Sequence, residues 1–237
     1  MKAHYALIGL TALMLAGCDD DDDNSPAPNP EPRATAEFTV TISNLTAAQP
    51  LSPLAAYLHD GSASGWSFGQ AASVGLEQLA EAGNGSEWLA MAKSQGAYYS
   101  ASGDGIVGPG ASDSVTLTVY ADQLSDIKLT GAGMLVNTND AFAGINNLDL
   151  SGLAVGDSLT INLPVYDAGT EGNSELAATI PGPAGGGAGF DAMRDDVDYV
   201  ARHPGVVGNQ DGYGESALDG THKFDAPVAR LSVIRQQ

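Results

Sequence analysis

The sequence predicts a mostly β domain, an antiparallel sandwich with two or three short helices. Several segments alternate apolar and polar residues, the period of a strand with one buried face. The clearest is 37–43, EFTVTIS, where Phe38, Val40 and Ile42 are the apolar positions. Gly-, Asn- and Asp-rich turns separate these segments without the regular strand–helix alternation of a parallel α/β sheet, which favours a sandwich.

Further strands are predicted at 114–120, 158–164 and 228–234, with weaker candidates at 129–136 and near Val206. One short helix is predicted after Ser73, a possible N-cap, with Gly83 as its stop, and a second after Ser86. We expect the apolar residues of both helices to cover a sheet edge or face; they are Val74, Leu76, Leu79, Ala80, Trp88, Leu89 and Met91.

The first seventeen residues are typical of a signal peptide. A basic start at Lys2 precedes an apolar run over 5–16, which is shorter than the ~20 residues of a membrane-spanning helix. The sequence Leu-Ala-Gly before Cys18 resembles the lipobox of bacterial lipoproteins, which implies acylation of Cys18 and a stable membrane anchor. The alternative is an ordinary signal peptide with an incidental cysteine.

The next segment, 18–36, is predicted to be a solvated spacer, because five aspartates at 19–23 and four prolines cannot bury apolar area. One domain is then expected over 37–237. The formal charge of −20 argues against binding to nucleic acid. Because Cys18 is the only cysteine, stability must come from a core, with or without metal ions.

Two acidic segments are candidates for a metal site. Asp167 and Glu171 flank a glycine in 166–171, YDAGTE, and can converge on one side of a loop. Asp140 closes a second loop, 137–140, and would join them if both loops lie at one edge of the sandwich. Several oxygens at flexible geometry suit calcium. Asp-x-Gly also shapes ordinary turns, so the spacing by itself leaves both interpretations open.

The sequence resembles the spondin N-terminal domain family over nearly the whole domain. Six motifs in order carry the resemblance: FTVTISNLT at 38–46, LSP at 51–53, NTNDAF at 137–142 with Gly144, YDAGTE at 166–171, HPG at 203–205 and APVARL at 226–231.

The resemblance implies a C2-like β-sandwich with calcium held at one edge by acidic loops. Carried over to this sequence, the family's calcium ligands fall on Asp140, Asp167 and Glu171. Two departures concern that site: Glu171 stands where the animal domain has Asp, and Ala141 separates Asp140 from its aromatic neighbour. A longer Glu arm still chelates calcium but shifts the position of the ion.

We therefore expect a non-enzymatic, calcium-binding adhesion or ligand-binding module, anchored through Cys18 in the cell envelope and facing the periplasm or the exterior. Calcium would bridge the acidic rim to an anionic glycan or lipid headgroup. The alternatives are a periplasmic hydrolase that uses the same acidic loops and a purely structural envelope lipoprotein. His59, His203 and His222 lack the close spacing of zinc ligands and are assigned to turns or packing.

Overall fold

A computed structural model describes residues 31–225 and 227–237, and residues 33–237 form one unit. The predicted signal peptide, Cys18 and most of the spacer lie outside the described residues. Within the described part of the chain, no helix has the length and apolar character needed to cross a membrane.

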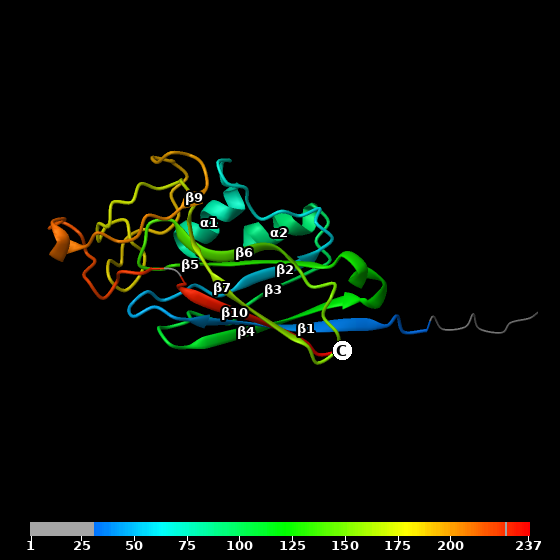
Figure 1. The fold of residues 1–237 in the computed structure, drawn as a ribbon. Helices are drawn as coiled ribbons and strands as arrows, with labels where there is room; N and C mark the ends of the chain where they lie inside the picture. The colour runs from blue at the N-terminus through cyan, green and yellow to red at the C-terminus, as the bar shows by residue number, and fades with distance from the viewer. Residues whose placement is uncertain (1–30, 226) are drawn as a thin grey trace, which may run out of the picture. The chain divides into compact units, whose positions relative to one another are not determined.

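Two antiparallel sheets make up the domain (Figure 1). The four-stranded sheet has the order β4 (Ser112–Tyr120), β1 (Thr35–Asn44), β10 (Ala229–Arg235) and β7 (Ser158–Leu163). The six-stranded sheet has the order β3 (Tyr99–Ser102), β2 (Ala55–His59), β5 (Lys128–Met134), β6 (Ala141–Asp149), β8 (Val165–Asp167) and β9 (Ala201–Arg202). The predicted antiparallel sandwich is confirmed.

The four strands with clear alternation form one sheet, and their predicted bounds are accurate to about two residues. In β1, Phe38, Val40 and Ile42 are fully buried, as the period of two requires. The first and last strands pair at the centre of this sheet, from Phe38 with Arg235 to Asn44 with Ala229. The strand predicted near Val206 is wrong, because β9 ends at Arg202 and residues 203–208 are irregular.

Apolar side chains fill the space between the two sheets. Phe38 and Leu117 from the four-stranded sheet belong to one cluster with Leu58 and Leu129 from the six-stranded sheet. In β2, Ala55 and Tyr57 face the opposite side, where they join a second cluster. Because β2 is buried on both faces, it lacks the alternation that identified the other strands.

Helices α1 (Val74–Ala82) and α2 (Ser86–Ser94) cover the outer face of the six-stranded sheet (Figure 1). Ser73 caps α1 by accepting a hydrogen bond from the Leu76 amide, and Gly83 ends it at φ +68°, as predicted. The predicted N-cap of α2 is wrong: Gly85 occupies that position and Ser86 lies in the first turn. Two short 3₁₀ helices, η1 (Ala121–Asp126) and η2 (Asn209–Asp211), complete the elements.

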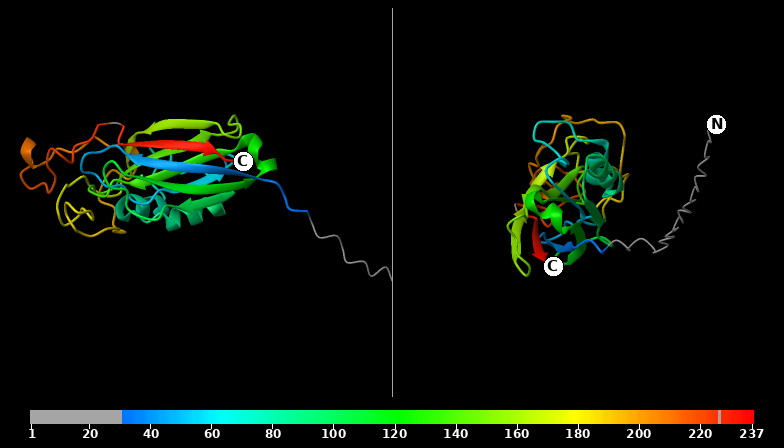
Figure 2. Two further views of the ribbon diagram at one scale, coloured as in Figure 1. Left: turned by 90° about the horizontal axis from the view of Figure 1, so that it is seen from below. Right: turned by 90° about the vertical axis from the view of Figure 1, so that its right-hand side faces the viewer.

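The second cluster, under the helices, is rich in aromatic residues. Trp66 contacts Phe142 and Tyr166 with ring centroids 5.0 and 5.1 Å away, and Trp88 contacts Tyr57 at 5.1 Å. Gly144 makes room for this cluster, since a Cβ there would lie 2.7 Å from the Trp66 ring. The domain thus has three layers, with helices on one sheet and the second sheet beneath it (Figure 2).

Candidate metal centre

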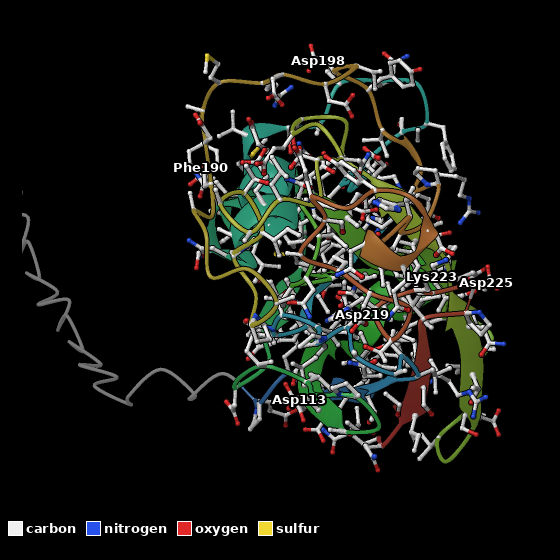
Figure 3. All side chains as sticks on the ribbon, turned by 90° about the vertical axis from the view of Figure 1, so that its left-hand side faces the viewer. Asp113, Phe190, Asp198, Asp219, Lys223 and Asp225 are labelled. Carbon is white, nitrogen blue, oxygen red and sulfur yellow. The ribbon has the colours of Figure 1, made fainter. Side chains whose placement is uncertain are left out.

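Strand pairing brings the two predicted loops together. Asp140 immediately precedes β6 and Asp167 ends β8, and these antiparallel strands pair with Ala141 opposite Asp167. The amide of Ala168 donates to the carbonyl of Asp140 at 3.3 Å. Asp140 and Asp167 therefore share one end of the sheet, where the long loops of the carboxyl-terminal third gather (Figures 1 and 3).

A third carboxylate comes from a loop that follows much later in the sequence. The amides of Asp195 and Asp198 donate to the carbonyls of Thr170 and Gly169, at 3.1 and 2.7 Å. Gly169 has φ +71°, and a Cβ there would lie 2.3 Å from the carbonyl oxygen of Tyr199. This close packing brings Asp196 to the site. One carboxylate oxygen each of Asp140, Asp167 and Asp196 lies within 4.8 Å of the other two.

The oxygens of Asp140 and Asp167 have different surroundings. Oδ2 of Asp140 accepts from the amides of Thr170 and Glu171, at 2.8 and 3.2 Å, whereas Oδ1 is buried without a hydrogen-bond partner in the described residues. Both oxygens of Asp167 are bonded, to the Gly169 amide and to Nδ2 of Asn173. The unpartnered Oδ1 is a free ligand position beside two other carboxylates.

Burial and mutual repulsion make this cluster costly without a cation. Asp140 is 0% exposed, and burial, followed by repulsion from Asp167, raises its pKa well above the ordinary value. Burial and the charge of Asp167 also raise the pKa of Asp196, which is half-buried. A divalent cation would stabilise the ionised form of all three side chains. The oxygen-only donor set fits a hard cation.

Glu171, the third predicted ligand, contacts the site through its backbone. Its amide binds Asp140, but its carboxylate is not a member of the cluster of three. Oε2 of Glu171 is buried and has no partner in the described residues. Burial, partly offset by Asn139 and reinforced by Glu81, raises the pKa of Glu171 to about 7.

More buried carboxylates lie next to this site, on α1. Glu81 is 1% exposed, and its Oε2 accepts from the Asp191 amide at 2.9 Å. Glu77 is 3% exposed and pairs with Arg194 at 2.7 Å. Arg194 also donates hydrogen bonds to the carbonyl of Ala72 and to the carboxylate of Asp198. These contacts hold the 190–200 loop against the start of α1. Figure 3 shows Asp198 and Phe190 along this loop.

The structure thus groups two of the three predicted ligands and adds one that sequence reasoning missed. Asp196 belongs to a segment with four aspartates in eight residues, DAMRDDVD at 191–198, and that density was the available signal. The three histidines serve hydrogen bonding and packing. His203, for example, contacts Asn173 at 2.8 Å and packs against Phe224.

The fold and site define a β-sandwich with an acidic loop cluster at one end, where three aspartates could hold a metal ion. The protein-family model Spondin_N matches residues 43–181, more than half of the chain, and the chain belongs to the spondin N-terminal domain family. A search of curated proteins found no match. Asp140, Asp167 and Glu171 lie within the matched residues, whereas Asp196 lies beyond them. Domains of this family are typically extracellular ligand-binding or adhesion-type modules, which is the class that the match indicates.

Proposed function

We propose that the protein is a calcium-stabilised ligand-binding or adhesion module, lipid-anchored in the cell envelope and without enzymatic activity. One observation carries the calcium assignment: three carboxylates converge, and the one that is fully buried, Asp140, has an oxygen with no partner in the described residues. Calcium suits a site of carboxylate and carbonyl oxygens at flexible geometry, whereas magnesium requires a stricter octahedron and loses its waters reluctantly.

The ion would tie three segments together: the loop before β6, the turn after β8 and the 195–198 loop. Asp140 and Asp167 are 0% and 5% exposed, so ligands from outside would reach the ion only on the side of Asp196. This burial favours a structural ion that positions the loops. An anionic glycan or lipid headgroup would add a ligand at the open side, beside Asp196.

A calcium titration of thermal stability tests this proposal. Calcium at about a hundred times its dissociation constant should add roughly 2.7 kcal/mol to the stability of chelator-treated protein. Asp167→Asn and Asp196→Asn should each weaken this effect, and Glu171→Gln should weaken it less. Asp104→Asn, at an exposed loop residue, is the matched control. Identical melting with and without millimolar calcium, together with no binding heat in calorimetry, would exclude the site.

The Asp167→Asn variant also tests whether the protein is an enzyme. A hydrolase that used these carboxylates would lose turnover in Asp167→Asn while keeping it after chelation. A ligand-binding module would show lower stability and calcium affinity in this variant and no turnover in either protein. Hydrolysis of a glycoside or ester substrate by the chelated wild-type protein would exclude the non-enzymatic proposal.

The anchor is tested at Cys18. The wild-type protein should incorporate labelled fatty acid and fractionate with membranes, because two or three acyl chains hold a protein stably at a bilayer. Cys18→Ser should lose the label. Equal labelling of both proteins would rule out acylation at this residue.

A further inference from the structure

A cavity of about 200 Å³ lies between the 64–73 segment and α2, away from the acidic loops. Its floor is aromatic, made of Tyr57, Trp66 and Trp88. Its rim carries neutral polar side chains, including Ser67, Gln70 and Gln95, all exposed. None of the residues that line the cavity is charged, although the whole chain carries −20.

The floor of this cavity is held rigidly. Trp66 packs against Phe142 and Tyr166 on one side and stacks with Trp88 at 6.3 Å on the other. Asn146 fixes the segment that carries Trp66, because its Nδ2 donates to the Trp66 carbonyl at 2.8 Å and its Oδ1 accepts from the Gly65 amide at 3.1 Å. A Cβ at Gly65 would lie 2.8 Å from the Trp88 ring, so only glycine allows this close approach.

The rim, by contrast, has hydrogen-bonding capacity to spare. The side chains of Ser67 and Gln95 form no hydrogen bonds within the described residues. In the Gln70 side chain, Nε2 donates to the Gly69 carbonyl, whereas Oε1 accepts no hydrogen bond from them. The indole N–H of Trp66 also has no acceptor there, whereas that of Trp88 donates to the Gly65 carbonyl. The Trp66 N–H is not fully buried, so solvent or a ligand can reach it. The cavity therefore combines a preformed aromatic surface with unused neutral donors and acceptors.

This chemistry selects one class of ligand. An anion would be repelled by the charge of the protein and would find no basic group in the cavity. A metal cation would find no carboxylate among the lining residues. A quaternary ammonium ion could lie on the aromatic rings, but it has no N–H or O–H group to pair with the Ser and Gln side chains. A purely apolar ligand would leave the polar rim unpaired, which costs binding free energy. A neutral sugar ring matches both parts, with its C–H face on the aromatic rings and its hydroxyls on the Ser and Gln side chains.

The size of the cavity sets how much of a glycan it holds. Pockets for drug-sized ligands measure roughly 300–1,000 Å³, and this one is smaller. We propose that the cavity between the 64–73 segment and α2 binds a single neutral sugar ring, such as the terminal residue of an uncharged glycan, without help from the metal. Because one ring makes few contacts, its dissociation constant should be on the order of 1 mM.

Intrinsic fluorescence tests this inference directly, since Trp66 and Trp88 are the only two tryptophans of the chain and both line the cavity. The protein is titrated with a panel of neutral pentoses, hexoses, deoxyhexoses and N-acetylhexosamines, and with glucuronic acid and glucosamine as charged comparisons. At least one neutral sugar should give a saturable change in emission, and the charged sugars should bind more weakly. Saturation-transfer NMR on the same samples provides a readout independent of tryptophan.

Three variants at exposed lining residues locate the binding. Gln95→Ala and Ser67→Ala each remove one hydrogen-bonding group and should weaken binding roughly fivefold, and Ala71→Phe should block the cavity. Gln210→Ala, at an exposed glutamine that does not line the cavity, should bind as the wild type does. Failure of every neutral sugar to saturate, or unchanged affinity in all three variants, would overturn the proposal.

A chelator arm separates this inference from the proposed calcium site. Sugar affinity should be the same with and without calcium at a temperature where the chelated protein stays folded. Loss of sugar binding on chelation from folded protein would overturn the metal-independent pocket while leaving the calcium site standing. Retained sugar binding with no calcium effect on melting would exclude the proposed calcium site while leaving the sugar-binding cavity standing.

Discussion

The ion pair between Glu77 and Arg194 predicts an asymmetry between two single substitutions. Arg194→Met leaves Glu77, which is 3% exposed, as a buried charge without its partner, and also removes the bonds from Arg194 to Ala72 and Asp198. Removing one partner of a buried pair costs about 3–5 kcal/mol. Because the Arg194 side chain is 23% exposed, water partly reaches the pair, and we expect a loss near the lower end, about 3 kcal/mol.

Glu77→Gln should cost less. The neutral amide still accepts a hydrogen bond, and Arg194 keeps Asp198 and the Ala72 carbonyl as partners. We expect a loss of about 1–2 kcal/mol, the range for a weakened hydrogen bond to a charged group. The double variant should be more stable than Arg194→Met, by about 1 kcal/mol, because the buried charge is gone.

Urea unfolding in the presence of chelator measures all four proteins without a contribution from calcium. The denaturant slope should be the same in each, so that the differences reflect stability alone. The reasoning fails if Glu77→Gln is as destabilising as Arg194→Met, or if the double variant is no more stable than Arg194→Met. Either result would mean that Arg194 does not compensate a buried charge on Glu77.

Two further predictions concern packing and pH. Gly144→Ala should lose about 1–3 kcal/mol of stability, because a Cβ there would lie 2.7 Å from Trp66 and 2.9 Å from the Gly131 carbonyl oxygen. Gly152 has open space around it, so Gly152→Ala should leave the stability nearly unchanged. Thermal melts of both variants measure the difference. His59 is fully buried, and both of its ring nitrogens are used in the neutral form: Nδ1 accepts from the Gly61 amide and Nε2 contacts Oγ1 of Thr130. Burial lowers its pKa below 6.5, an effect that Asp60 opposes and Lys128 reinforces. The unfolded chain therefore binds the proton more readily, so the contribution of His59 to stability is complete above about pH 6.5 and is lost as the pH falls from there toward the lower folded-state pKa. Between pH 7 and pH 5, His59→Gln should lose less stability than the wild type, and equal losses would show that this histidine is not the titrating group.

The sequence clearly predicted the strands that are buried on one face, whereas among those buried on both it indicated β5 only as the weaker candidate at 129–136 and missed β2. The four strands of the β4-β1-β10-β7 sheet alternate in burial, and all four were identified. In β2 every residue is buried, because one face packs against the other sheet and the opposite face against α2 and the 63–66 segment. Such a strand has no period of two, and Ala-rich composition gave no other signal.

The same reasoning explains what could be predicted of the site. Asp140 and Asp167 adjoin strand ends, so a guess about which strands meet was enough to place them together. Asp196 reaches the site only because the Asp195 and Asp198 amides bond to carbonyls of the 169–170 turn. Hydrogen bonds between two irregular loops leave no periodic pattern in a sequence. Glu171 matched a motif, but the direction of its side chain depends on the conformation of the turn. Its amide, rather than its carboxylate, contacts Asp140.

The buried carboxylates around the acidic loops are the physical reason for proposing an ion there. Asp140, Asp167, Glu77 and Glu81 are all buried, and among them only Glu77 has a basic partner in the described residues. Burying more carboxylates than cations costs free energy, which the apolar core between the sheets must offset as long as no cation is bound. A divalent cation would remove much of this cost in the folded state alone, so its binding free energy would become folding stability. The two sheets enclose an apolar core, so their stability does not depend on a bound cation. Calcium dependence should therefore concentrate in the loops that carry these carboxylates.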